Sequence, residues 1–203
     1  MTMWYLIRAF GMVSLMALTL STVLGVLATQ SQRSARAVDR RIVQQLVHRS
    51  SALFGLLALA GHIALSIADS YVRVGVSGTL IPFAAAYRPV AMGVGSIATY
   101  VLILVAVTGL SRARFARSRG SAIAWRAIHM SAYLGWLLSL LHGVFGGSDT
   151  RTVWAILTYT ACTAAVLVAV VWRYTAPQQR RIRHRTSEGH RGPARLTAIG
   201  DQR

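Results

Sequence analysis

Apolar residues gather into five stretches along the chain, separated by segments rich in arginine, glycine and polar residues. The stretches cover approximately residues 4–28, 47–68, 89–110, 123–145 and 153–172. A transmembrane α-helix requires about 20 consecutive, mostly apolar residues, and each stretch has approximately that length. The pattern therefore predicts an all-α membrane protein, built as a bundle of five transmembrane helices.

The composition supports this prediction. Hydrophobic residues make up 54% of the 203 residues and charged residues 13%, whereas a soluble domain carries about 25% charged residues. The net charge of +17 does not indicate nucleic-acid binding, because the basic residues lie mostly between the apolar stretches and in the C-terminal tail. Positive charge follows the first stretch rather than preceding it, which argues against a cleaved signal peptide.

All 22 basic residues are arginine, and their distribution predicts the orientation. Two connecting segments and the tail are rich in arginine, while the other two connections hold only Arg73, Arg88 and Arg151. Positive charge favours the cytoplasmic side. We therefore expect the N-terminus outside and the C-terminus in the cytoplasm.

The last residues form a separate segment. Residues 1–174 constitute the expected membrane domain, and residues 175–203 a basic cytoplasmic tail that we expect to be disordered. Such a tail can associate with anionic lipids or dock an acidic donor protein.

Four histidines lie within the apolar stretches, and they form two spaced pairs. His62 follows His48 by 14 positions, and His142 follows His129 by 13. Each pair spans roughly 20 Å along a helix, and an intramembrane histidine usually marks a functional site. Because the second and fourth helices run in the same direction, we expect His48 to pair with His129 and His62 with His142.

One feature of this spacing is unfavourable. On a straight helix, residues 13 positions apart point about 140° away from each other. A kink would bring His129 and His142 to one side of their helix, and Gly135 is the expected hinge.

Two b-type haems, each held between two imidazoles, are the occupants that we favour for these pairs. One alternative is that the histidines only form hydrogen bonds to neighbouring helices. Another is a histidine-lined path for zinc or copper, which usually includes carboxylates, cysteines or methionines. The apolar stretches contain almost no acidic residue; Asp69 lies at the end of one.

The segment from Trp4 to Tyr174 resembles the ferric-reductase-like transmembrane domain, the family of NADPH oxidases, ferric reductases and the haem subunit of periplasmic methionine sulfoxide reductase. The resemblance rests on His48-x13-His62, on His129-x12-His142, and on the neighbours in His48-Arg49 and Trp125-Arg126-x-x-His129. It implies that the four histidines ligate two stacked b haems, in a multi-pass protein of the bacterial plasma membrane.

The chain departs from the oxidases and ferric reductases of this family in one respect. Only about 30 residues follow Trp172, and the sequence contains no glycine-rich dinucleotide-binding motif. We therefore expect an electron-transfer subunit of an oxidoreductase, supplied by a separate flavoprotein or quinol and passing electrons to an external acceptor. Two hypotheses of other classes are a metal-ion transporter and a membrane anchor without haem.

Four arginines are candidates for binding the haem propionates. Arg49 and Arg126 adjoin the inner ligands, although setting the topology explains them equally well. Arg88 and Arg151 lie on the arginine-poor outer side, near the level of His62 and His142. The outer segments 70–88 and 143–151 are expected to form a lid and a wall at this level; alternatively, segment 70–88 is a surface loop packed on the lipid headgroups.

Overall fold

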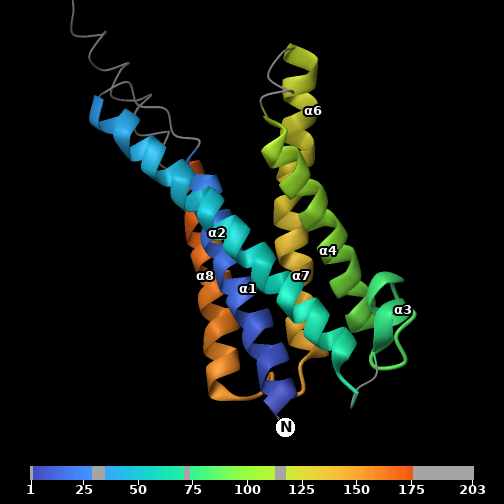
Figure 1. Ribbon diagram of the computed structural model, residues 1–203. Helices are drawn as coiled ribbons and strands as arrows, with labels where there is room; N and C mark the ends of the chain where they lie inside the picture. The colour runs from blue at the N-terminus through green and yellow to red at the C-terminus, as the bar shows by residue number, and fades with distance from the viewer. Residues whose placement is uncertain (1, 29–34, 71–73, 113–117, 176–203) are drawn as a thin grey trace, which may run out of the picture.

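The computed structural model describes residues 2–28, 35–70, 74–112 and 118–175, and within these ranges it is all-α (Figure 1). The expected tail lies almost entirely outside the described residues. The helices, in chain order, are α1 (Thr2–Leu27), α2 (Ala35–Ala68), α3 (Gly75–Leu80), α4 (Pro89–Leu110), α6 (Arg119–Met130), α7 (Ala132–Gly146) and α8 (Val153–Thr175).

Five helical segments are long and apolar enough to cross a membrane, as predicted. Helix α4 has the predicted bounds, whereas α2 begins 12 residues earlier than the predicted stretch 47–68. Half of these additional residues are polar or charged. Hydrophobicity marks where a helix can lie in lipid, but backbone hydrogen bonding continues the helix beyond that limit.

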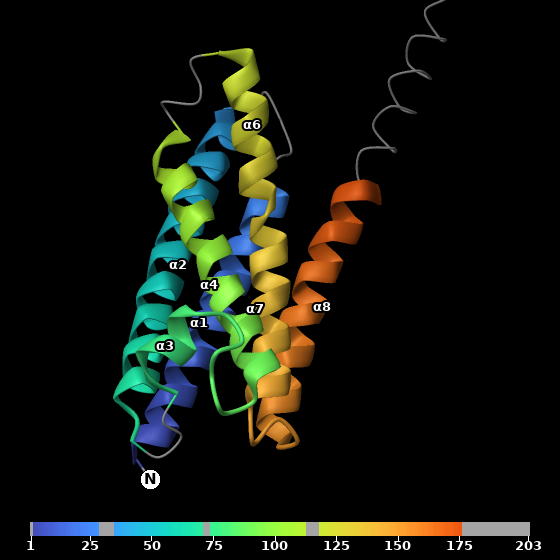
Figure 2. The same cartoon turned by 90° about the vertical axis from the view of Figure 1, so that its right-hand side faces the viewer.

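The helices form two antiparallel hairpins and a flanking helix. Helix α1 packs along α2, α4 packs along α7, and α8 lies against α1. Figure 1 shows α1 and α2 crossing on one side and α4 and α7 on the other, and Figure 2 shows α8 at the flank of the bundle. We refer to the end where α1 begins as the N-terminal end and to the other as the opposite end.

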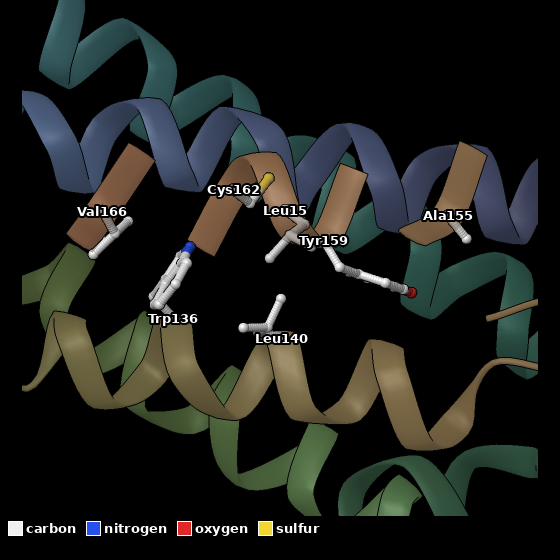
Figure 3. Packing of buried hydrophobic residues seen from close by; sticks show 7 residues of the cluster. All are labelled: Leu15, Trp136, Leu140, Ala155, Tyr159, Cys162 and Val166. Carbon is white, nitrogen blue, oxygen red and sulfur yellow. The ribbon is translucent and has the colours of Figure 1, made fainter. Parts of the chain in front are cut away.

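The core lies where α1, α7 and α8 meet (Figure 3). Trp136 of α7 is buried there, and its indole N–H donates a hydrogen bond of 2.8 Å to the hydroxyl of Thr19 on α1. Many large apolar side chains on the outer faces are exposed, as expected for helices that contact lipid. The cluster consists of Leu15, Trp136, Leu140, Ala155, Tyr159, Cys162 and Val166.

The fourth span is interrupted at Ser131, between α6 and α7. The N–H of Ser131 donates to the carbonyl of Ile128 at 3.0 Å, which is a tighter turn than the α-helical pattern. The prediction of a hinge at Gly135 is therefore wrong. Gly135 instead allows close packing, since a Cβ atom there would lie 3.1 Å from Leu102 Cδ2.

The segment between α2 and α4 folds against α4 in its described part. The hydroxyl of Ser96 on α4 donates a hydrogen bond to the carbonyl of Thr79 at 2.7 Å. The hydroxyl of Tyr100, also on α4, donates to the carbonyl of Leu80. Helix α3 also contacts α2. The segment expected as a lid thus connects the two hairpins at the N-terminal end of the bundle (Figure 2).

Candidate functional site

The four histidines meet as two pairs at different heights in the bundle. The rings of His48 and His129 have centroids 6.4 Å apart, with planes inclined at 69°. Those of His62 and His142 have centroids 6.2 Å apart, with planes inclined at 76°. The histidines predicted to be neighbours are therefore neighbours. The first pair lies toward the opposite end of the bundle and the second toward the N-terminal end.

These separations match two imidazoles that share one metal ion. A ring nitrogen binds a metal at about 2 Å, and the ring centroid lies roughly 1 Å further, so rings on opposite sides of one ion have centroids about 6 Å apart. Two imidazoles joined by a direct hydrogen bond of about 3 Å would have centroids only about 5 Å apart. The geometry thus fits a two-imidazole site at each level.

Backbone carbonyls orient the rings at the N-terminal level. Nδ1 of His62 lies 2.8 Å from the carbonyl oxygen of Ile7 on α1, and Nδ1 of His142 lies 2.8 Å from that of Ala91 on α4. A carbonyl can only accept, so each Nδ1 carries the hydrogen and each Nε2 retains its lone pair. This is the tautomer of a metal-binding imidazole whose second nitrogen is held by the protein.

The two rings at the opposite level differ from each other. Nδ1 of His48 lies 2.8 Å from the carbonyl of Ser21 on α1, and the hydroxyl of Ser21 lies 3.0 Å from the same nitrogen. Nδ1 of His129 lies close to the carbonyl of Val105 on α4 but makes no hydrogen bond of normal geometry. Three of the four imidazoles are thus held by a carbonyl of a neighbouring helix.

A glycine lies beside each histidine ring, four residues after the carbonyl that faces it. In an α-helix the carbonyl of residue i is covered by residue i+4, so glycine there exposes the carbonyl to the ring. A Cβ atom at Gly95 would lie 2.5 Å from Nδ1 of His142, and one at Gly11 would lie 3.1 Å from Nδ1 of His62. We call each arrangement a carbonyl–glycine notch; the pairs are Ile7 with Gly11, Ser21 with Gly25, Ala91 with Gly95 and Val105 with Gly109.

The notches repeat along the chain. The two glycines of α1, Gly11 and Gly25, are 14 positions apart, and Gly95 and Gly109 of α4 follow them after 84 positions each. Their histidines therefore lie on two hairpins of similar design, as in membrane proteins with parallel internal repeats. We did not predict these glycines as site residues from sequence; the recurrence of Gly-x13-Gly beside the spaced histidines is the signal for them.

An aromatic ring covers His129. Trp125, one turn earlier on α6, stacks on His129 with centroids 4.9 Å apart and planes inclined at 13°. The Trp125 N–H donates to the carbonyl of Thr108 at 2.9 Å, and the guanidinium carbon of Arg112 lies 5.3 Å from the Trp125 centroid. Trp125 was noted in sequence only as a neighbour of the ligand, and Arg112 was not singled out.

The four predicted arginines are placed differently from one another. Arg49 on α2 and Arg126 on α6 are exposed, as is Arg151 in the turn after α7. Arg88 donates from Nη1 to the carbonyls of Phe145 and Gly147, at 2.8 and 3.1 Å. Arg88 therefore caps the C-terminal end of α7, the helix that carries His142, with a favourable charge at a helix C-terminus.

A further arginine ties the N-terminal level together. Arg8 of α1 pairs with Asp149 in the turn after α7, and its guanidinium carbon lies 5.2 Å from the centroid of Trp4. Arg8 directly follows Ile7, whose carbonyl faces His62. The ion pair fixes the turn against α1. The positive charge of Arg8 gave no indication of this role because its partner lies far along the sequence.

Neither pair gains a third metal-binding side chain from the residues that the structure describes. Among the described residues, no group of three or more histidine, cysteine, aspartate or glutamate side chains could hold a metal ion. A protein zinc site usually has three or four protein ligands. Each level therefore offers two imidazoles within the part of the chain that the structure describes.

Comparisons with known proteins give no match: no family model, curated protein or solved structure matches this chain.

Proposed function

We propose that this chain is a di-haem b-type membrane cytochrome. The observation that carries the proposal is the separation of 6.4 and 6.2 Å between paired imidazole rings at two levels. The orientation of Nδ1 toward backbone carbonyls at three of these rings supports it, because it leaves Nε2 free to bind iron.

Haem explains why two protein ligands per level suffice. Haem iron would take four nitrogens from its macrocycle, and the two imidazoles of one level would complete its coordination. A bare zinc or copper ion would need further protein ligands, and the described residues provide none. The haem would supply one-electron transfer, while the chain would hold the ligands, set their basicity and exclude water.

We further propose that the protein is related to the ferric-reductase-like membrane cytochromes. Electrons would enter from a separate flavoprotein or quinol at the cytoplasmic side, pass the His48/His129 level and then the His62/His142 level, and leave to an external acceptor. Arg151, Arg49 and Arg126 are exposed near the two levels and remain candidate propionate partners. Arg88 is already bonded to the end of α7.

Optical spectroscopy with haem quantification tests the proposal. Protein purified from cells grown with ample haem should contain two non-covalent b haems per chain, reducible by dithionite. Metal analysis of the same sample measures zinc and copper in parallel. Protein without haem would overturn the proposal, and stoichiometric zinc or copper in its place would favour the metal-transport hypothesis.

Variants of the histidines test the pairing. His62→Ala and His142→Ala should each remove the same haem and leave most of the other, because both rings face one position. His48→Ala and His129→Ala should remove the second haem. His48→Ala and His142→Ala removing a common haem would contradict the pairing; Tyr5→Ala, at an exposed position on α1, serves as the control.

A further inference from the structure

We propose that Trp125 is a positioning residue that holds the plane of the His129 imidazole and, with Arg112, distinguishes the His48/His129 centre from the His62/His142 centre. This inference rests on the proposed function. It identifies a platform of three residues, Arg112, Trp125 and His129, on the side of His129 that faces α4 and the start of α6.

His129 needs such a support because its second nitrogen is not fastened. Nδ1 of His129 is buried and lies near the carbonyl of Val105 without a hydrogen bond of normal geometry, whereas the same nitrogen of the other three histidines is within 2.8 Å of a carbonyl oxygen. A ligand imidazole normally depends on that bond for its orientation. The glycine beside it, Gly109, also leaves the most space, since a Cβ atom there would lie 3.6 Å from the ring.

Trp125 can hold the ring because Trp125 is itself held. Residues four positions apart lie on one face of a helix, so Trp125 stacks nearly parallel on His129 with planes inclined at 13°. Its N–H is anchored on the carbonyl of Thr108, a buried residue of α4 whose own hydroxyl bonds to Leu104. The indole plane is therefore fixed by a helix other than its own.

The platform has an electrostatic consequence. An imidazole with a weaker Nδ1–H···O=C bond would be a less basic ligand, which favours the reduced iron relative to the oxidised iron. The guanidinium carbon of Arg112 lies 5.3 Å from the indole centroid. Its positive charge also favours the reduced iron and therefore also raises the reduction potential. At the other level Arg8 also acts on His62, but its charge is paired with that of Asp149. We therefore expect the His48/His129 centre to have a higher reduction potential than its two imidazoles alone would give.

Four variants test the inference in the full chain, and one of them, Arg112→Gln, removes the charge beside the indole. Trp125→Leu removes the stacking, Trp125→Phe retains an aromatic face without the Thr108 bond, and Trp172→Leu alters an exposed tryptophan in the last turns of α8. The readouts are the low-spin haem signals by electron paramagnetic resonance, the haem content and a redox titration of each centre.

We expect Trp125→Leu to broaden or abolish the low-spin signal of one haem, the one that His129→Ala removes, and to leave the second haem intact. Trp125→Phe should restore most of that signal, and Trp172→Leu should match the unaltered protein. Arg112→Gln should lower the potential of the same centre without loss of haem.

Two outcomes would overturn the inference while the proposed function stands: an unchanged signal and potential in Trp125→Leu, or equal effects on both centres. Absence of haem from the unaltered protein would instead overturn the proposed function. The two failures are therefore distinguishable.

Discussion

At the scale of single residues, the four histidines are placed by backbone atoms more than by side chains. Three imidazoles point Nδ1 at a carbonyl of a neighbouring helix, and a glycine four residues later leaves room for the ring. In this way a buried, neutral imidazole makes a hydrogen bond to a carbonyl through Nδ1 and keeps Nε2 available for a metal. The notches thus meet the demands of burial and of ligation together.

The notches predict unequal tolerance of their glycines to alanine. Gly95→Ala would place a methyl group 2.5 Å from Nδ1 of His142, so the ring must move away from the Ala91 carbonyl. Overpacking of this kind costs about 1–3 kcal/mol, and we expect Gly95→Ala to lose the haem of the His62/His142 level. Haem content and thermal stability of the purified variant provide the measurement.

Gly109→Ala is the matched control, because its methyl group would lie at ordinary contact distance, 3.6 Å, from His129. That variant should retain both haems. Equal haem loss in the two variants would mean that the space beside the histidine ring does not determine haem retention.

At the scale of elements, the interruption at Ser131 resolves the mismatch between helical periodicity and the spacing of His129 and His142. A continuous helix would point the two rings about 140° apart, whereas α6 and α7 are separate helices joined at Ser131. The hydroxyl of Ser131 donates to the carbonyl of Ile128 at 2.6 Å. Serine bonding back to the preceding turn is a recognised cause of helix bending.

Because of the interruption, we expect the His48/His129 site to depend on the rotation of α6 relative to α7 about the helix axis. Insertion of one alanine between Ser131 and Ala132 would rotate α6 by about 100° relative to α7 and carry His129 away from His48. We expect loss of the haem at the His48/His129 level only, measured by haem content and by the loss of one low-spin signal.

Insertion of one alanine between Gly120 and Ser121 is the control, because it lies before His129 and leaves the phase of His129 and α7 unchanged. Loss of the same haem in the control would show that α6 tolerates no insertion and that phase is not the cause.

At the scale of the whole molecule, two hairpins of similar design face each other and α8 supports one of them (Figure 1). The glycines recur after 84 positions, and the histidines face each other in two levels. Two levels at different depths are what electron transfer across a membrane requires, because each step is then shorter than the bilayer. In the proposed function, the direction of electron transfer would depend on the orientation in the membrane, which the arginine distribution predicts.

Cysteine labelling measures the orientation. In a Cys162→Ser background, Ser148→Cys and Gly120→Cys place single thiols at the N-terminal and opposite ends, respectively, where both positions are exposed. A membrane-impermeant thiol reagent should label Ser148→Cys in intact cells and should label Gly120→Cys only after the membrane is opened. The reverse labelling would invert the proposed orientation.

The sequence by itself determined the five spans, because the length of an apolar run and the cost of leaving it in water are local properties. It also determined which histidines are neighbours, since chain direction and depth follow from counting the spans. Only the tertiary structure decided how the rings are held. The carbonyls of Ile7, Ser21 and Ala91, the ion pair of Arg8 with Asp149 and the support of Trp125 by Thr108 all join residues distant in sequence. The position of the break at Ser131 likewise depends on local hydrogen bonding that a hydrophobic pattern does not encode.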